Sequence, residues 1–192
     1  MMKVNLKQGA KIHYHSKGMM AKRILWMIVK ITLFRFSFRT WFGYRCFLLR
    51  LFGAKIGKGV RIYSNTDIVF PWNLEVGDYT IIAGDTLIYT WGYIKIGSNV
   101  NISHKVQICA ASHDHTDPLF RVIFNPVVIE DQVWICTQAF VGPGVVVKEG
   151  ALLGACCVLM KDAEAWTIYA GNPARKVCLL YTSDAADEAR SV

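Results

Sequence analysis

Aliphatic side chains recur every six residues along about half of the chain. Four runs follow this spacing, and a short slip or a gap separates each run from the next. All 17 positions are Ile, Leu or Val: Ile56, Ile62, Ile68, Leu74, Val76, Ile82, Ile88, Ile94, Ile96, Ile102, Ile108, Ile129, Ile135, Val141, Val147, Leu153 and Leu159. A fixed repeat indicates an architecture of stacked units. Neither a helical period nor strands joined by hairpins explains the spacing, because hairpin turn signals are sparse.

Two smaller regularities accompany the aliphatic repeat. Glycine directly follows five of the aliphatic positions, at Gly57, Gly77, Gly97, Gly142 and Gly154. Small or β-branched side chains usually stand four residues after an aliphatic position: Val60, Thr66, Thr80, Thr86, Val100, Val106, Ser112, Val133, Ala139, Val145, Ala151 and Cys157. We expect the aliphatic side chains to fill a three-sided prism, the small ones to fit where it narrows, and glycine to permit positive φ at its corners.

Three hexapeptides, about 18 residues, make one triangular coil, and stacked coils share a single core. The sequence therefore predicts an all-β dominated fold, a parallel β-helix of about six coils over residues 56–177. After Val177 the run CLLYTSDAADEARSV does not continue the pattern. We expect residues 178–192 to be a non-native or disordered tail.

The first 55 residues have a different character. Residues 1–61 hold 14 Lys and Arg and no Asp or Glu, and the first acid is Asp67. We expect residues 1–55 to form a basic amphipathic segment, helical over about 19–52 with a break near 37–43, that caps the open end of the prism. Such a segment suits a membrane surface or another anionic partner. Nucleic acid is not expected as a partner, because no nucleic-acid-binding motif accompanies the charge.

The cysteines and the apolar stretches bear on the compartment. The six cysteines form no CxxC pair, and their spacing suits neither a zinc ribbon nor a disulfide framework. The densest apolar stretch, residues 24–52, is interrupted by five cations, and no signal peptide pattern is present. These features predict a cytoplasmic protein with free thiols.

Residues from Phe47 to Lys176 resemble the hexapeptide-repeat sugar O-acetyltransferases, above all exopolysaccharide acetyltransferases of the colanic-acid type. The matching stretches include FLLRLFGAKIGKGVRI, ICAASHDHTDP, VVIEDQVWI and IYAGNPARKV. Single hexapeptides are weak signals, whereas the SHDHTDP turn followed by the VWI coil and AGNPA is specific. The resemblance implies a left-handed β-helix and a homotrimer with active sites between neighbouring prisms. It also implies acetyl-CoA as co-substrate and a sugar or lipid-linked sugar as acceptor.

The catalytic base is expected in the gap of the repeat between Ile108 and Ile129. A loop that leaves a rigid scaffold is where function concentrates, and a neutral imidazole suits proton abstraction near neutral pH. By resemblance, His113 matches the catalytic base of the family. Asp114 would orient the imidazole or shape the turn, and His115 lies close by in the sequence. Asp85, Asp114, His115 and Trp134 are expected to contact the acceptor.

The resemblance assigns the CoA groove to later coils. Trp134, Cys136, Gly154 and Ala155 would line the pantetheine arm, and Arg175 and Lys176 would meet phosphates. A backbone N–H between Trp134 and Cys136 would stabilise the oxyanion. Cys136, Cys156 and Cys157 replace residues that are mostly Gly or Ser in relatives, which would narrow the groove. No cysteine sits beside a base, so direct transfer is expected rather than an acyl-enzyme.

Three alternatives stay open at this stage. A metal enzyme resembling the γ-class carbonic anhydrases would take His104, His113 and His115 as zinc ligands, although we expect no metal, because the ligands of that class are more widely separated. A non-catalytic β-helix would use the basic N-terminus to dock on a membrane. The same chemistry could also serve serine, an amino sugar or an antibiotic as acceptor.

Overall fold

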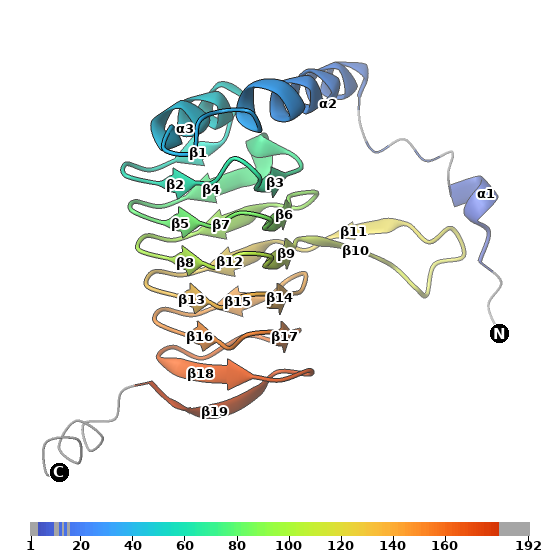
Figure 1. Cartoon of the computed structure of the whole chain (residues 1–192). Helices are drawn as coiled ribbons and strands as arrows, with labels where there is room; N and C mark the ends of the chain where they lie inside the picture. Colours follow the sequence, from blue (N-terminus) through green and yellow to red (C-terminus); the bar gives the residue numbers. More distant parts are fainter. Residues whose placement is uncertain (1–3, 10–11, 13, 15, 181–192) are drawn as a thin grey trace, which may run out of the picture.

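The computed structural model, which describes residues 4–9, 12, 14 and 16–180, contains a three-sided column of short strands (Figure 1). Sheet A consists of β1 (Lys55–Ile56), β4 (Leu74–Val76), β7 (Ile94–Ile96), β12 (Val127–Ile129) and β15 (Val146–Val147). Sheet B consists of β2 (Arg61–Ile62), β5 (Ile81–Ile82), β8 (Asn101–Ile102), β13 (Trp134–Ile135), β16 (Leu152–Leu153), β18 (Thr167–Ala170) and β19 (Arg175–Leu179). Sheet C consists of β3 (Asp67–Ile68), β6 (Leu87–Tyr89), β9 (Gln107–Cys109), β14 (Phe140–Val141) and β17 (Val158–Leu159).

The chain visits sheets A, B and C in turn, and each strand pairs in parallel with the strand one coil away. Five complete coils are followed by a partial sixth, in which Ala163 bridges to Val147 and β18 pairs with β16. The last strand, β19, pairs antiparallel with β18 and closes this end of the column. The predicted parallel β-helix of about six coils is confirmed.

The core is the aliphatic repeat itself. All of its side chains are at most 2% exposed except Ile56, which is half-buried. Threonines at the small positions form hydrogen bonds from their hydroxyls to the main chain of the next coil. Thr80 Oγ1, for example, donates to the carbonyl of Gly97 at 2.7 Å. One predicted inward position is wrong: Ser112 is exposed, because the chain has already left the prism there.

The glycines that follow the aliphatic positions have a role different from the predicted one. Positive φ occurs at Gly53, Gly59, Gly144, Gly150 and Gly171, and at corner residues such as Asp85 and Cys156. It does not occur at the five predicted glycines. A Cβ on Gly77 would lie 2.6 Å from backbone atoms of Gly97 and Ser98. Glycine is therefore required there because adjacent coils approach too closely for a side chain.

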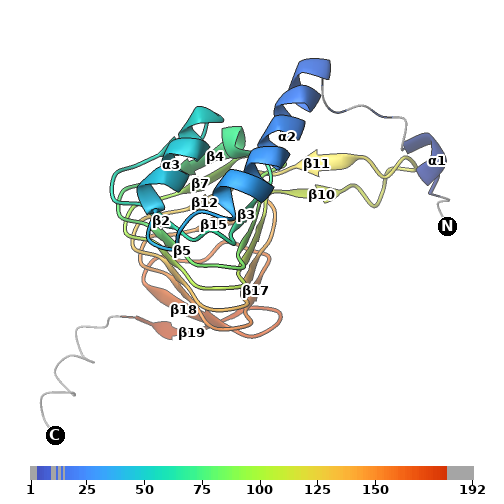
Figure 2. The same cartoon turned by 45° about the horizontal axis from the view of Figure 1, so that its top comes forward.

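Helices cover the β1 end of the prism, as predicted (Figure 2). Helix α2 (Lys17–Val29) starts at Ser16, whose Oγ accepts from the N–H of Met19, and continues as a π-helical turn, η1 (Lys30–Phe34). Helix α3 (Phe42–Leu51) follows the break. The cap inserts Trp26 into the open end, where its Nε1 donates to the carbonyl of Ile68 at 2.8 Å. A short 3-10 turn, η2 (Pro71–Asn73), precedes β4.

A buried cation ties α3 to the prism and to the break that precedes this helix. Arg45 is completely buried, and burial lowers its pKa. Its guanidinium donates to the carbonyls of Ile62 (2.5 Å), Phe38 (2.9 Å) and Arg39 (2.8 Å) and to Ser37 Oγ (2.8 Å). This member of the basic segment is therefore structural.

The folded chain extends past Val177, since Cys178 and Leu179 belong to β19 and not to a tail. Residues 181–192, the rest of the predicted tail, lie outside the described residues. Within the described ranges, no helix combines the length and the hydrophobicity needed to cross a bilayer.

Candidate active site

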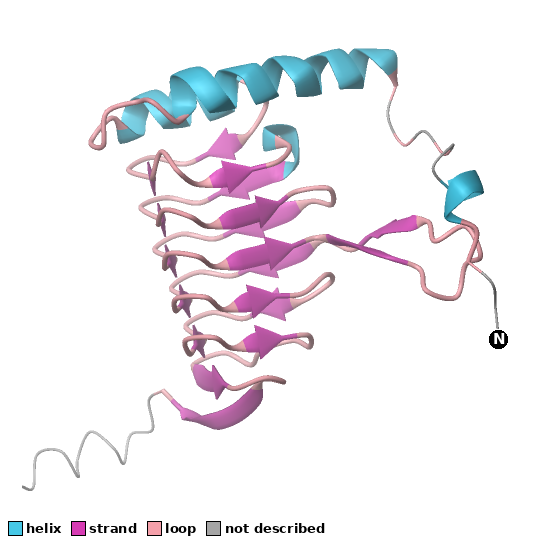
Figure 3. Ribbon diagram, turned by 45° about the vertical axis from the view of Figure 1, so that its right-hand side comes forward, coloured by secondary structure: helices cyan, strands magenta, loops and turns pink. Residues whose placement is uncertain are grey.

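An antiparallel hairpin leaves the prism between β9 and β12, at the predicted gap (Figures 1 and 3). Its strands are β10 (Ala111–His113) and β11 (Val122–Phe124), with Ala111 opposite Phe124 and His113 opposite Val122. The hairpin carries His113 to the end of β10, away from the hydrophobic core, where it is exposed. The fold therefore holds this imidazole on a two-stranded arm instead of a free loop.

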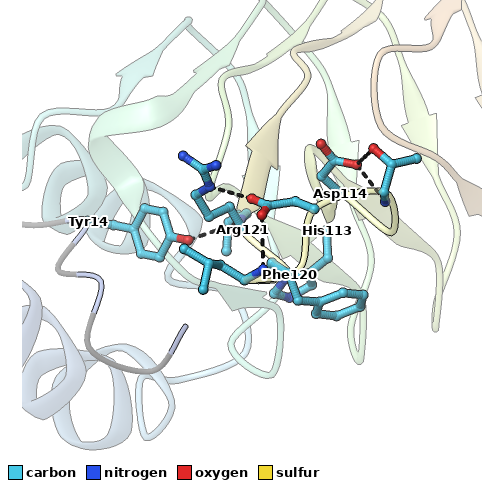
Figure 4. Close-up of polar contacts among 9 residues, drawn as sticks. Tyr14, His113, Asp114, Phe120 and Arg121 are labelled. Carbon is cyan, nitrogen blue, oxygen red and sulfur yellow. Dashed lines mark hydrogen bonds and ion pairs between the residues drawn. The ribbon is translucent and has the colours of Figure 1, made fainter. Parts of the chain in front are cut away.

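The ring of His113 is oriented by Phe120 (Figure 4). His113 Nδ1 lies 2.8 Å from the carbonyl oxygen of Phe120. The two rings stack with centroids 4.5 Å apart and planes 9° from parallel. Because a carbonyl only accepts, Nδ1 carries the proton, and in the neutral ring Nε2 is the free basic nitrogen. Sequence reasoning missed Phe120, because its bond to His113 is made by the main-chain oxygen. The position of that oxygen depends on the positive φ of Phe120 (+51°), which the sequence does not reveal.

Carboxylates build the turn at the tip of the hairpin. Asp114 Oδ1 accepts from the N–H (2.8 Å) and the Oγ1 (2.6 Å) of Thr116, and these bonds lower the pKa of Asp114. Asp117 pairs with Arg121 and accepts from the N–H of Leu119, and its pKa is lowered chiefly by Arg121. Of the two roles predicted for Asp114, the contacts support turn formation, whereas the imidazole bonds the Phe120 carbonyl.

The N-terminal residues reach this hairpin, a contact that the sequence does not predict. The N–H of Asn5, just before α1 (Leu6–Gly9), donates to the carbonyl of Pro118 at 2.7 Å. Tyr14 Oη accepts from the N–H of Val122 at 3.0 Å (Figure 4). The ring of Tyr14 meets those of Trp91 and Phe124 edge to face, at 6.5 and 6.1 Å. The arm that carries His113 is thus braced at two points by residues near the N-terminus.

A pocket of about 370 Å³ opens beside His113. Its lining is Tyr89, Trp91, Ala111, Ser112, His113 and Val122. Two aromatic rings form one wall: those of Tyr89 and Trp91, with centroids 6.3 Å apart and planes 25° from parallel. Burial raises the pKa of Tyr89. Among these described lining residues there is no carboxylate.

The residues predicted for the CoA groove lie on another part of the prism. Cys136, Gly154 and Ala155 stand where the chain turns from sheet B to sheet C, and Asp85 occupies the same turn in an earlier coil. Trp134 lies on sheet B, is 46% exposed and donates from Nε1 to Ser103 Oγ at 3.3 Å. The arm of His113 leaves instead between sheets C and A. One chain therefore does not bring these residues to its own His113.

Two of the predicted oxyanion donors are already engaged. The N–H of Trp134 donates to the carbonyl of Ala151 at 3.0 Å, and that of Cys136 to Leu153 at 2.9 Å. Burial raises the pKa of the Cys136 thiol. These two amides hold the coils together and are not free for a ligand.

The two predicted phosphate contacts differ in their surroundings. Arg175 and Lys176 are both exposed on β19 at the end of the prism. Lys176 Nζ pairs with Glu164 Oε2 at 2.5 Å, which raises the pKa of Lys176. Arg175 donates to the carbonyl of Ala174 at 3.2 Å. A guanidinium has five N–H groups, so Arg175 is the better placed of the two for an anion.

The histidines proposed as zinc ligands are not assembled into a metal site. His104 lies at the turn after β8, where its Nε2 is 3.1 Å from Thr137 Oγ1. His113 and His115 lie on the arm. Among the residues that the structure describes, no group of three His, Cys, Asp or Glu side chains could hold a metal ion.

Known proteins share this sequence and this fold, although no protein-family model matches the chain. A protein of Escherichia coli K12 named "Putative colanic acid biosynthesis acetyltransferase WcaF" is 42% identical over 150 residues, which cover 78% of this chain and 82% of that protein. The galactoside O-acetyltransferase of the same organism is 26% identical over 129 residues, which cover 66% of this chain and 55% of that protein.

Solved structures agree with these relatives. The crystal structure of a hexapeptide-repeat-containing acetyltransferase from Vibrio cholerae superposes with a TM-score of 0.80 at 26% identity, covering 92% of this chain and all of that one. A second structure of that protein is a complex with acetyl-CoA. A galactoside acetyltransferase in complex with coenzyme A has a TM-score of 0.82 at 21% identity, covering 94% of this chain and 91% of that one. With its left-handed β-helix and its WcaF-like sequence, the chain belongs to the hexapeptide-repeat acetyltransferases.

Proposed function

We propose that this acetyltransferase moves an acetyl group from acetyl-CoA to a hydroxyl of a sugar or polysaccharide precursor, with His113 as the general base. The observation that carries the role of His113 is the bond from its Nδ1 to the Phe120 carbonyl, which leaves Nε2 basic. The ring is exposed and faces a pocket, so a hydroxyl can reach it. A base held in one tautomer and one orientation is what proton abstraction requires.

The proposed reaction is a direct transfer. Nε2 of His113 takes the proton of the acceptor hydroxyl while that oxygen attacks the thioester carbon. The carbon–sulfur bond then breaks, and the imidazolium returns its proton to the sulfur that leaves. The Phe120 carbonyl accepts from Nδ1–H throughout and stabilises the imidazolium that forms. The balance needs no further reactant.

The pocket beside the base fits a hydroxylated ring. Aromatic faces such as those of Tyr89 and Trp91 pack against the C–H faces of a sugar, and Ser112 offers a hydroxyl. A cationic acceptor would find no carboxylate among the described residues of the lining. The names of WcaF and of the galactoside enzyme point to carbohydrates as well. A sugar acceptor, soluble or lipid-linked, is therefore favoured over serine or an antibiotic.

The co-substrate is assigned to the later coils, below the arm in Figure 1. Arg175 would meet a phosphate there, and the pantetheine arm would run along the turn between sheets B and C that holds Gly154 and Ala155. Because Trp134 and this turn lie on a different edge from His113, a site that contains both needs a second chain. This supports an oligomer whose sites lie between prisms, and the family resemblance implies a homotrimer. The free thiols suit the reducing cytoplasm.

An acetyl-transfer assay tests the proposal. The release of CoA from acetyl-CoA is measured against a panel of sugars, nucleotide sugars, serine and chloramphenicol. We expect turnover with a sugar, and its loss, by about a thousandfold or more, in His113→Ala. His115→Ala is the matched control. His115 lies on the same arm but is not one of the residues that line the pocket, so this variant should stay active. An active His113→Ala protein would contradict the role of the base, and turnover with chloramphenicol alone would contradict the sugar acceptor.

A further inference from the structure

The helical cap exposes an unusual amount of apolar surface. Twelve exposed large apolar side chains fall within the 32 residues from Met20 to Leu51, whereas the 125 residues from 56 to 180 expose nine. Isolated exposed apolar residues are ordinary, but a concentration of them marks a surface that something else covers. The cap has already buried its other side, including Trp26, Phe34 and Leu49, against the prism.

The exposed residues of α2 and η1 form a regular stripe. Met20, Ile24, Met27, Ile28 and Ile31 are spaced as one face of a helix and are 43% to 52% exposed. The residues that face the prism, Trp26 and Phe34, lie off this stripe and are 1% exposed. An ordinary surface helix has one apolar face, which is buried. This helix has a second apolar face toward the outside, and its polar groups lie between the two.

Aromatic side chains extend this surface beyond α2. Phe36, Phe38 and Trp41, in the break between the cap helices, are 84%, 65% and 56% exposed. Phe47 and Leu51, one turn apart on α3, are 58% and 69% exposed. We use the term outer cap face for these five residues together with the stripe. Aromatic rings of this kind favour the boundary between water and lipid.

The exposed cations of the cap point to an anionic partner. Lys17 and Arg35 stand at the two ends of the stripe, and Arg39 lies beside Phe38; all three are exposed. No Asp or Glu precedes Asp67, and Asp67 itself pairs with Lys30 at 2.6 Å. A surface with apolar residues in the middle, cations at the edges and no acid matches a bilayer that carries anionic lipids. Within the described residues no helix can span it, so such contact would be peripheral.

We infer that the outer cap face docks the protein on an anionic bilayer, with α2 lying in the interface. The cap crosses the end of the prism (Figure 1), so docking leaves the three sides of the column free for neighbouring chains. In a trimer of parallel prisms, three caps would reach one membrane together and bind more tightly than one. The arm that carries His113 leaves the side of the column after its third coil (Figure 3), so docking through the cap leaves the arm uncovered.

Vesicle binding by the full-length chain tests the inference. Vesicles of phosphatidylethanolamine and phosphatidylglycerol are compared with vesicles of phosphatidylcholine alone. We expect binding to the anionic vesicles that weakens as salt is added, because screening reduces the attraction of the cations. The combined change Ile24→Ser, Ile28→Ser and Phe38→Ser should weaken this binding by about tenfold or more. Arg35→Gln with Arg39→Gln should weaken it by a similar factor on anionic vesicles only.

The control is Met160→Ser with Val177→Ser, which removes two exposed apolar side chains outside the cap. These changes should leave vesicle binding as it is. Circular dichroism and transfer to a soluble acceptor show whether each variant is folded and active, so a failure of docking is distinct from a failure of acetyl transfer. Vesicle binding of the triple variant equal to that of the parent would overturn the inference. So would a change of oligomeric state by light scattering without loss of vesicle binding, because a second copy would then cover this face.

Discussion

His113 and Phe120 are joined twice, by a bond of 2.8 Å from the imidazole Nδ1 to the main-chain oxygen and by stacking of the two rings at 4.5 Å. The first contact selects the tautomer and the second restrains rotation of the ring. Both depend on the tight turn at the tip of the arm, where Asp114 and Asp117 accept from main-chain N–H groups. The orientation of the His113 ring is therefore set by the Phe120 carbonyl and ring, which the turn holds in place.

Phe120→Ala separates the two contacts. It keeps the main-chain carbonyl but removes the ring, so Nε2 stays basic while the imidazole rotates more freely. We expect kcat to fall about tenfold with an unchanged KM for acetyl-CoA, since a loss of orientation acts on the chemical step. Steady-state kinetics measure both values. Phe38→Ala serves as the control, because it removes an exposed aromatic ring from the cap and not from the arm. An unchanged kcat in Phe120→Ala would show that the stacking does not contribute to catalysis.

The cysteines are expected to be dispensable for chemistry. Burial raises the pKa of Cys136 and Cys157, which makes their thiolates scarce. Cys109 Sγ is engaged with the main chain, because it donates to the carbonyl of Ala111 at 3.1 Å. Replacing Cys109, Cys136, Cys156 or Cys157 singly by Ser should leave kcat within about threefold of the parent. Loss of turnover in one folded variant, with a ping-pong kinetic pattern in the parent, would instead reveal an acyl-cysteine.

The pair Tyr93 and Glu75 predicts a pH effect on sheet A. Tyr93 Oη donates to Glu75 Oε2 at 2.5 Å, which raises the pKa of Tyr93 to about 12 and is the main cause of the lowered pKa of Glu75. The bond stabilises the fold while Glu75 is ionised and Tyr93 is protonated. Its contribution is lost as pH falls through the lowered pKa of Glu75, and again as pH rises through about 12.

Tyr93→Phe tests this assignment. The pKa of Glu75, followed by NMR titration, should move up toward its ordinary value, although Lys55 at 3.3 Å still holds part of the shift. Urea unfolding should show the parent more stable than Tyr93→Phe at pH 7, with the difference disappearing in strong acid. A difference that grows on acidification would have the wrong sign.

Arg45→Leu should destabilise the cap strongly. The change removes the donor of the buried carbonyl of Ile62 and of the partly buried carbonyls of Phe38 and Arg39, so we expect a loss of about 3 kcal/mol. Urea unfolding measures the loss. Arg39→Leu is the control, since that side chain is exposed and the change should cost less than about 0.5 kcal/mol. Equal stability of the two variants would contradict the structural role of Arg45.

The column was predictable because each hexapeptide contains one aliphatic residue that must point into the core. Burial of Ile102 fixes which side of its strand faces inward, and the aliphatic residues six positions before and after it require the same orientation. The reason for Gly77 was not predictable, because local sequence cannot distinguish a need for positive φ from close approach of the next coil. The interruption after Ile108 indicated an excursion, but the antiparallel pairing of β10 with β11 did not show in the periodicity.

The site was predictable in part for the same reason. His113 stands out in the sequence as an imidazole inside a break of the repeat. Phe120 and Tyr14 do not, because one acts through its main chain and the other lies 108 residues from its partner Val122. Residues such as Trp134 and Ala155 were assigned by resemblance, and the fold places them on another edge of the same prism.

The bond between Tyr14 and Val122 bears on the order in which the molecule is assembled during synthesis. Tyr14 leaves the ribosome more than a hundred residues before the strand it braces. The arm cannot acquire its final support until the coils on both sides of it exist and the N-terminal stretch has folded back across them. Activity should therefore appear late in refolding, after the column has formed, and a bulky fusion placed ahead of Tyr14 would slow its arrival.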